Sequence, residues 1–255
     1  MIFNTIYVYV IRVFLLNIIK MNEKFEEKIV GITIGIRFAR SFRLRDVYGE
    51  IIDDVLFSKD SPFNTKFFPA IQENSHEKTL YNPETTEYLR INTDDIILAV
   101  RVEQNFEKRF GWLKEDVFSF YEDQLFSAHS IKNIKRIGII FTHKVEPQKT
   151  INEAISLFTK NTIKNPENFS LSFSQKEVSL NAISKKGVND YKNVIYNFTE
   201  VEGSMLSEMD FQHYFNPSVE DLRDCYGKNI FDEAKSFLVK NYYSWLEKHE
   251  QEIPS

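Results

Sequence analysis

Four arginines, Arg37, Arg40, Arg43 and Arg45, lie within the stretch RFARSFRLR, and side chains of this type at this spacing can hold an anion. A guanidinium presents a rigid fork of N–H donors that matches phosphate and carboxylate oxygens. The stretch joins an expected strand to an expected helix, and helix N-termini also favour anions. A later strand adds Arg136. The pattern predicts an anion-binding groove; the alternative is surface arginines paired with the abundant Asp and Glu.

The groove is expected to take a phosphorylated ligand, an acidic peptide or a nucleic-acid end. Arg37 shares one face of its strand with Gly31 and Gly35, so another backbone can approach closely there. We expect no cofactor.

No metal-ligating or catalytic motif stands out. The chain contains neither a His-Glu-x-x-His nor a Cys-x-x-Cys motif, and its five histidines do not cluster. Asp210 and His213 are three residues apart in an expected strand, where they point to opposite faces. Cys225, the single cysteine, lies beside the apolar stripe of an expected helix. We therefore predict no catalytic residue, no metal ligand and a structural role for Cys225.

Two pairs of adjacent carboxylates, Asp53-Asp54 and Asp94-Asp95, resemble acid/base dyads at first sight. Adjacent residues do not face each other on a helix or a strand. The first pair ends an expected helix and the second lies in an expected turn, so both pairs are predicted to be solvated.

Aromatic residues offer a second kind of site, because the chain contains 23 Phe and 12 Tyr. The segment FNTKFF lies in the least regular stretch, residues 58–78, which is predicted to be a surface loop. Its Phe63, Phe67 and Phe68 are the predicted contact with a protein partner.

These two sites give two function hypotheses. The leading one is a non-enzymatic binding or adaptor protein that acts with a protein partner. The alternative is a phosphoryl-ligand or nucleic-acid-handling protein, with or without enzymatic activity, that uses the arginine cluster. The first predicts scattered or ion-paired arginines. The second predicts arginines that converge on one cleft beside an unpaired carboxylate or histidine.

The composition limits the partners and the compartment. The chain has 255 residues, is 42% hydrophobic and 27% charged, and carries a net charge of −5. The charge is spread along the chain, which disfavours broad electrostatic binding to nucleic acid. A single cysteine rules out a disulfide within the chain and suits a reducing compartment, so a cytoplasmic protein is expected.

Hydrophobic periodicity predicts the elements that must position these residues. Each half of the chain reads as strand, helix, two to four strands, and helix. The first half contains a strand at 29–38, a helix from Ser41 to about 57, strands at about 86–91 and 96–104, and a helix within 111–130. The second contains a strand at 134–144, a helix at 150–160, strands within 168–173, 190–203 and 205–215, and a long helix from Ser218 to about 248.

The predicted fold is α+β: two similar half-domains, residues 21–133 and 134–255, each an antiparallel sheet covered by helices. Residues 1–20 are the most hydrophobic stretch, and three interpretations remain open: upstream sequence before a start at Met21, a weak membrane anchor, or an added strand or helix. Membrane association is not expected unless residues 1–20 belong to the protein.

Residues 25–248 resemble a sporadically distributed family of uncharacterised bacterial proteins of about this length. The resemblance is carried by Arg37-Phe38 at the end of a strand, Phe68-Pro69, the strand Arg136-Ile137-Gly138, and Asp210 to Tyr214 before an aromatic-rich helix. It implies an accessory or defence-related module and supplies no catalytic residues.

Overall fold

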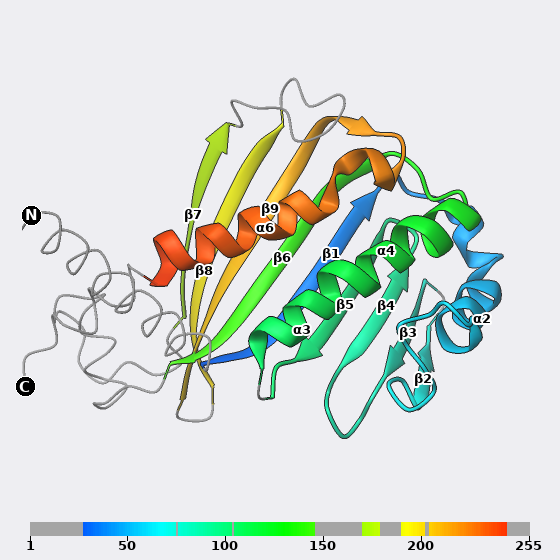
Figure 1. Cartoon of the computed structure of the whole chain (residues 1–255), viewed down its shortest axis with the longest axis horizontal. Coiled ribbons are helices and arrows are strands. Elements are labelled where there is room, and N and C mark those ends of the chain that lie inside the picture. The colour runs from blue at the N-terminus through cyan, green and yellow to red at the C-terminus, as the bar shows by residue number, and fades with distance from the viewer. Residues whose placement is uncertain are drawn as a thin grey trace, which may run out of the picture.

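The computed structural model describes residues 28–74, 76–103, 105–145, 170–178, 190–201 and 204–243. The strands in them are β1 (Ile29–Phe38), β2 (Ala70–Glu73), β3 (Glu77–Tyr81), β4 (Tyr88–Asn92), β5 (Asp95–Arg101), β6 (Ile134–Val145), β7 (Ser170–Val178), β8 (Tyr191–Val201) and β9 (Ser204–Val219). They form one antiparallel sheet in the order β2-β3-β4-β5-β1-β6-β9-β8-β7 (Figure 1).

The described helical segments are η1 (Phe42–Arg45), α2 (Tyr48–Phe57), α3 (Phe106–Trp112), η2 (Leu113–Val117), α4 (Phe118–Phe120), η3 (Tyr121–Phe126), η4 (Leu222–Cys225), α6 (Gly227–Phe237) and η5 (Leu238–Tyr243). The four segments from α3 to η3 follow without a break and form one long helix with π-helical turns at η2 and η3. Asn105 begins this helix because its side chain accepts a hydrogen bond from the backbone N–H of Lys108, 2.9 Å away.

The two halves of the chain meet where β1 pairs with β6. Thr33 lies opposite Ile140 there, and Gly31 and Gly35 lie opposite Thr142 and Gly138. Outward from this seam, β5, β4 and β3 follow β1 just as β9, β8 and β7 follow β6, and each half ends in a long helix. The predicted α+β fold with two similar antiparallel halves is confirmed. The two sheets are joined edge to edge into one.

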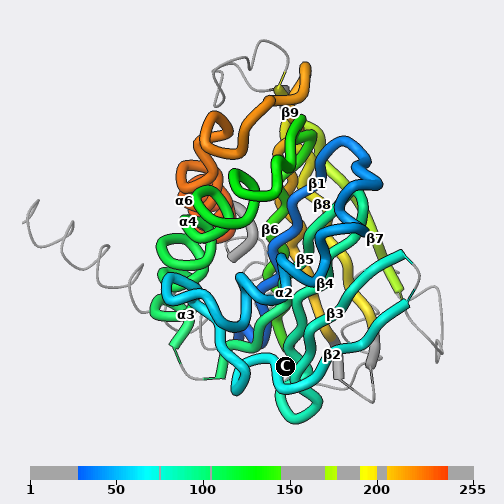
Figure 2. The backbone as a smooth tube through the Cα atoms, turned by 90° about the vertical axis from the view of Figure 1, so that its right-hand side faces the viewer, coloured from blue at the N-terminus to red at the C-terminus, as the bar shows by residue number. Residues whose placement is uncertain are grey.

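The helices cover one face of the sheet (Figure 2). Ile32, Ile34 and Ile36 of β1 point into the core and are at most 1% exposed. Alternation along the strand places Gly35 and Arg37 on the opposite face. No described helix covers that second face, so it is the surface on which the arginines can meet a ligand.

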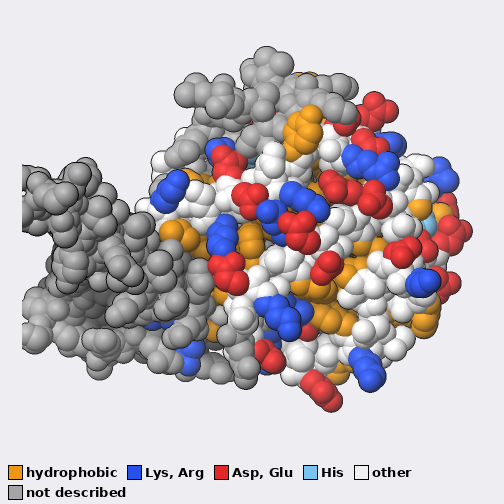
Figure 3. Space-filling view, viewed as in Figure 1, with side chains coloured by type: hydrophobic (Ala, Val, Ile, Leu, Met, Phe, Trp, Pro, Cys, Tyr) orange, Lys and Arg blue, Asp and Glu red, His pale blue; other side chains and the backbone are white. Residues whose placement is uncertain are grey.

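Ion pairs join the two long helices across the covered face. Lys114 lies 2.6 Å from Asp232 of α6, and Lys228 of α6 lies 2.7 Å from Glu115. Figure 3 shows this face, on which acidic and basic side chains are interspersed. No helix within the described residues is both long and apolar enough to cross a membrane.

Three local predictions are corrected by the structure. Residues 58–78 are not a single loop, because β2 lies within them and β3 begins there. The last strand does not end before Asn216-Pro217, because β9 continues to Val219. Ser218 therefore does not begin the last helix; Asp221 caps η4 by accepting a hydrogen bond from the N–H of Arg223, 3.1 Å away.

Several predictions fall outside the described residues. They concern residues 1–20, the helix at 150–160 and the end of the last helix near 248.

Candidate anion-binding site

One pocket of about 670 Å³ brings together three of the five arginines predicted to bind an anion. We call it the arginine pocket. Its lining consists of Arg37, Phe38, Arg40, Asp94, Lys135, Arg136, Tyr191, Tyr214, Phe215 and Asn216. Four of these side chains are cationic and one is a carboxylate, although the whole chain carries a net charge of −5. The pocket is therefore locally positive on a protein that is negative overall.

Strand register creates this concentration of charge. Arg37 of β1 lies directly opposite Arg136 of β6, so two like charges face each other across adjacent strands. Such a pair is destabilising by itself. Arg40 follows the end of β1, and Lys135 precedes Arg136. A bound anion would therefore reduce the repulsion between the guanidinium groups of Arg37 and Arg136.

Asp94 compensates only part of this charge. Its carboxylate lies 3.5 Å from Arg40 and 3.8 Å from Arg37, distances too long for strong hydrogen bonds. Both arginines remain accessible, with 63% and 49% of their side chains exposed. They can therefore turn from Asp94 towards an incoming anion.

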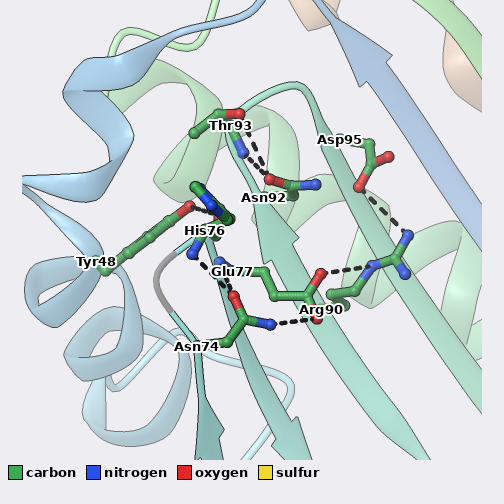
Figure 4. A network of polar contacts seen from close by, with 8 residues as sticks. All are labelled: Tyr48, Asn74, His76, Glu77, Arg90, Asn92, Thr93 and Asp95. Carbon is green, nitrogen blue, oxygen red and sulfur yellow. Dashed lines mark hydrogen bonds and ion pairs between the residues drawn. The ribbon is translucent and has the colours of Figure 1, made fainter.

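Asp95 lies opposite Arg37 on its other side but faces a different partner. Arg90 lies between Asp95 and Glu77, at 3.6 Å and 3.9 Å (Figure 4). The prediction that Asp94 and Asp95 are solvated is wrong, because their side chains are only 18% and 19% exposed and both form ion pairs. Asp94, in the turn, and Asp95, the first residue of β5, therefore lie among the arginines at this end of the sheet.

A chain of hydrogen bonds holds Arg136 in place. Its Nη1 donates to the hydroxyl of Tyr214 at 3.2 Å, and that hydroxyl donates to Oε1 of Gln212 at 2.8 Å. Nε2 of Gln212 in turn donates to Asp210 at 2.5 Å. Burial raises the pKa of Asp210, while Gln212 and then Arg136 act in the opposite direction. Nε of Arg136 is buried and has no hydrogen-bond partner, which leaves one donor unused.

Two stacked rings with a cation at each end form a row across four strands beside the pocket. The guanidinium of Arg136 lies 5.6 Å from the ring centroid of Tyr214, and Tyr214 stacks on Tyr191 with centroids 4.6 Å apart and ring planes 5° apart. Nζ of Lys176 lies 4.1 Å from the ring centroid of Tyr191. Distances below about 6 Å are those of cation–π contacts. We call these four residues the tyrosine ladder.

The remaining two predicted arginines lie outside the pocket. Arg45 contacts His76 at 2.7 Å and lies 5.3 Å from the ring of Phe42, and both Arg43 and Arg45 are exposed. Arg43 and Arg45 belong to the 3-10 turn η1, beyond the end of β1. The convergence predicted for the whole cluster therefore holds for Arg37, Arg40 and Arg136 alone. Asp94 of the lining is paired, and no histidine is among the described residues that line the pocket.

The predicted partner-binding phenylalanines do not form a free surface. Phe63 is 4% exposed and Phe68 is 1% exposed, so the prediction is wrong for these two residues. Phe63 packs edge-on against Trp112 at 5.7 Å and against Phe120 at 6.2 Å. The segment turns its rings inward because the long helix offers an apolar surface beneath it.

Phe67 is half-buried and belongs to a second pocket of about 540 Å³. The guanidinium of Arg109 lies 5.1 Å from the ring of Phe67 and 4.3 Å from that of Trp112. Glu87, 7% exposed, accepts a hydrogen bond from Arg109 at 2.5 Å and one from the backbone N–H of Arg101 at 2.9 Å. Arg109, held by Glu87, covers the rings of Phe67 and Trp112, so these side chains pack against one another within the chain.

A buried polar pair supports the rim of the arginine pocket. Asp190 and His213 are fully buried, with 3.2 Å between the carboxylate and Nε2. The carboxylate also accepts the backbone N–H of Asn216, a lining residue, at 3.0 Å. Burial lowers the pKa of His213, and Asp190 opposes that shift. Asp210 and His213 lie on opposite faces of β9, as predicted.

Among the described residues, no group of three or more His, Cys, Asp or Glu side chains could hold a metal ion. Cys225 is buried, and burial raises the pKa of its thiol.

Sequence reasoning missed Lys135, Asp94, Tyr191, Tyr214 and Asn216. These residues come from four segments, β6, the turn before β5, β8 and β9, that only the strand register brings together. The one local signal was Lys135, which directly precedes Arg136.

The comparisons with known proteins leave the family open. No family model and no curated protein matches the chain. Among solved structures, the chain has a weak similarity to Methanococcus jannaschii TBP, with 10% sequence identity, coverage of 82% of this chain and 98% of that chain, and a TM-score of 0.26. A similarity of this size carries no argument about function.

Proposed function

We propose that this protein is a binding module that holds the anionic group of its ligand in the arginine pocket. One observation carries the proposal: Arg37 and Arg136 face each other across adjacent strands, with Arg40 and Lys135 beside them and one loosely paired carboxylate, Asp94. A phosphate or carboxylate between the facing guanidinia would turn their repulsion into two charge-assisted contacts.

Binding rather than catalysis is proposed because the lining supplies mainly hydrogen-bond donors. Asp94, the one carboxylate among the described lining residues, is already shared by two arginines. The anion can belong to a protein partner, in which case the molecule acts as an adaptor. That role then rests on the arginine pocket and not on the buried Phe63 and Phe68.

A cytoplasmic setting belongs to the same proposal. It is supported by the single cysteine, Cys225, which is buried and free.

Titration calorimetry with O-phosphoserine as the probe tests the proposal. Arg37→Gln removes an exposed pocket cation, and Arg43→Gln is the matched control, since Arg43 belongs to the same cluster but lies outside the pocket. A hydrogen bond to a charged group contributes about 1.5–3 kcal/mol, so Arg37→Gln should weaken binding by at least about tenfold. Arg43→Gln should leave binding unchanged. Absence of binding by the parent protein, or equal losses in the two variants, would rule the proposal out.

A further inference from the structure

The arginine pocket contains four aromatic rings, and their availability restricts the class of ligand. A nucleotide or a single-stranded nucleic acid is commonly bound by stacking a base on the face of a ring. Whether the ring faces in the lining are open is therefore informative.

Neither tyrosine offers an open face. Tyr214 is covered by Arg136 on the β6 side and by Tyr191 on the β8 side. Tyr191 is covered by Tyr214 on one side and by Lys176 of β7 on the other. The strand order fixes these positions, because the four side chains come from four consecutive strands, β6, β9, β8 and β7.

The two phenylalanines of the lining belong to the core. Phe38 is 1% exposed and meets Phe126 edge-on at 5.8 Å, while Phe215 is 5% exposed and packs against His213 at 4.9 Å. Little of either ring is therefore accessible to a ligand. Among the described residues, no ring of the lining can stack on a base unless the contacts of the tyrosine ladder are broken.

The polar lining suits a compact and highly charged group. Arg37, Arg40 and Arg136 line one pocket, and a phosphate monoester has three terminal oxygens and a charge of about −1.5 to −2 to satisfy them. A carboxylate has two oxygens and a single charge. Besides the cations, the side chains of Asn216 and Tyr191 can form hydrogen bonds with a hydroxyl or amide group in the part of the ligand that carries the phosphate.

We propose that the ligand of the arginine pocket is a phosphomonoester on an aliphatic carrier, either a phosphorylated side chain of a polypeptide or a phosphorylated sugar, and not a nucleotide or a nucleic acid. This inference rests on the proposed function, since it specifies the anion held by the same arginines. Within the tyrosine ladder, Tyr214 orients Arg136, and the neighbouring side chains cover the faces of both tyrosine rings on which a base would stack.

The decisive comparison uses two probes that share one phosphate carrier: ribose 5-phosphate and adenosine 5′-monophosphate. Calorimetry on the full chain should give affinities within about threefold of each other, because the base gains no stacking contact. Stacking on a free ring would strengthen the binding of the nucleotide by about tenfold or more. A tenfold preference for the nucleotide, lost in Arg37→Gln, would overturn this inference and leave the proposed function intact.

Two further titrations complete the test. Comparing the affinity for a blocked phosphoserine peptide with that for ribose 5-phosphate shows whether the phosphate is carried by a polypeptide or by a sugar, and tighter binding of either one supports the inference. A 5′-phosphorylated oligothymidylate should bind no more tightly than ribose 5-phosphate at physiological salt; a tenfold gain would overturn the inference. If neither inorganic phosphate nor any of these probes binds, the proposed function fails and the inference falls with it.

Discussion

Replacing Asp94 by asparagine should tighten the binding of an anion. Asp94 is the carboxylate of the arginine pocket, and it lies 3.5 Å from Arg40 and 3.8 Å from Arg37. It competes with the ligand for these arginines and also repels the ligand directly. Asparagine has the same shape without the charge, so the substitution removes both effects while preserving the packing.

The size of the effect follows from the geometry. A phosphate held by the same two arginines would lie about 6 Å from the Asp94 carboxylate, and like unit charges at that separation repel by roughly 0.7 kcal/mol in water and about 2.8 kcal/mol at an effective dielectric constant of 20. The pocket is open to solvent, so a value of about 1–1.5 kcal/mol is expected, or roughly tenfold in affinity.

The assay is titration of O-phosphoserine into each variant at low and at physiological salt. Asp53→Asn is the matched control, because Asp53 is exposed on α2 and lies outside the pocket lining. The gain from Asp94→Asn should shrink as salt screens the pocket charges. Unchanged or weaker binding in Asp94→Asn would refute the argument that Asp94 competes with the ligand.

Three other outcomes follow from the structure. Tyr214→Phe removes the hydroxyl that joins Arg136 to Gln212. Phosphoserine should therefore bind about threefold to tenfold more weakly, while thermal stability changes little. An unchanged affinity would mean that the Tyr214 hydroxyl does not orient Arg136. Glu87→Gln removes the counter-charge of Arg109, which is half-buried beside Trp112, and should lower the free energy of unfolding by about 1–3 kcal/mol in urea titrations. A loss below about 0.5 kcal/mol would contradict the importance of this pair. Burial raises the pKa of Glu122 to about 7, so the folded protein favours the protonated carboxyl. The folded state therefore loses stability as the pH rises from the pKa of Glu122 in the unfolded chain towards 7. Glu122→Gln should raise the melting temperature at pH 8 more than at pH 4, and an equal change at both pH values would contradict this assignment.

The sequence was sufficient to predict the elements that have strong periodicity. The alternation in β1 located the strand and placed Arg37 on the face opposite Ile36. The repeated order of elements predicted two similar halves, which the sheet order supports. It did not show that β1 and β6 would pair and join the halves into one sheet. That pairing links residues about a hundred positions apart, and no local pattern encodes it.

The candidate site was predicted only in part, because strand pairing between distant residues also decides which side chains line it. Local composition identified Arg37 and Arg40, but only the register placed Arg136 opposite Arg37. Arg43 and Arg45 lie in η1, outside the pocket lining. Phe63 and Phe68 of FNTKFF were misassigned, because the irregular sequence around them suggested exposure. Phe63 instead packs against the long helix, a tertiary contact that hydrophobic periodicity does not reveal.

The most direct test of the central claim is a crystal structure of the protein with O-phosphoserine. Our account predicts a phosphate between Arg37 and Arg136, within hydrogen-bonding distance of both guanidinia, with Tyr214 still stacked on Tyr191. A phosphate bound at Arg43 and Arg45 instead, or an arginine pocket that stays empty at saturating ligand, would contradict it.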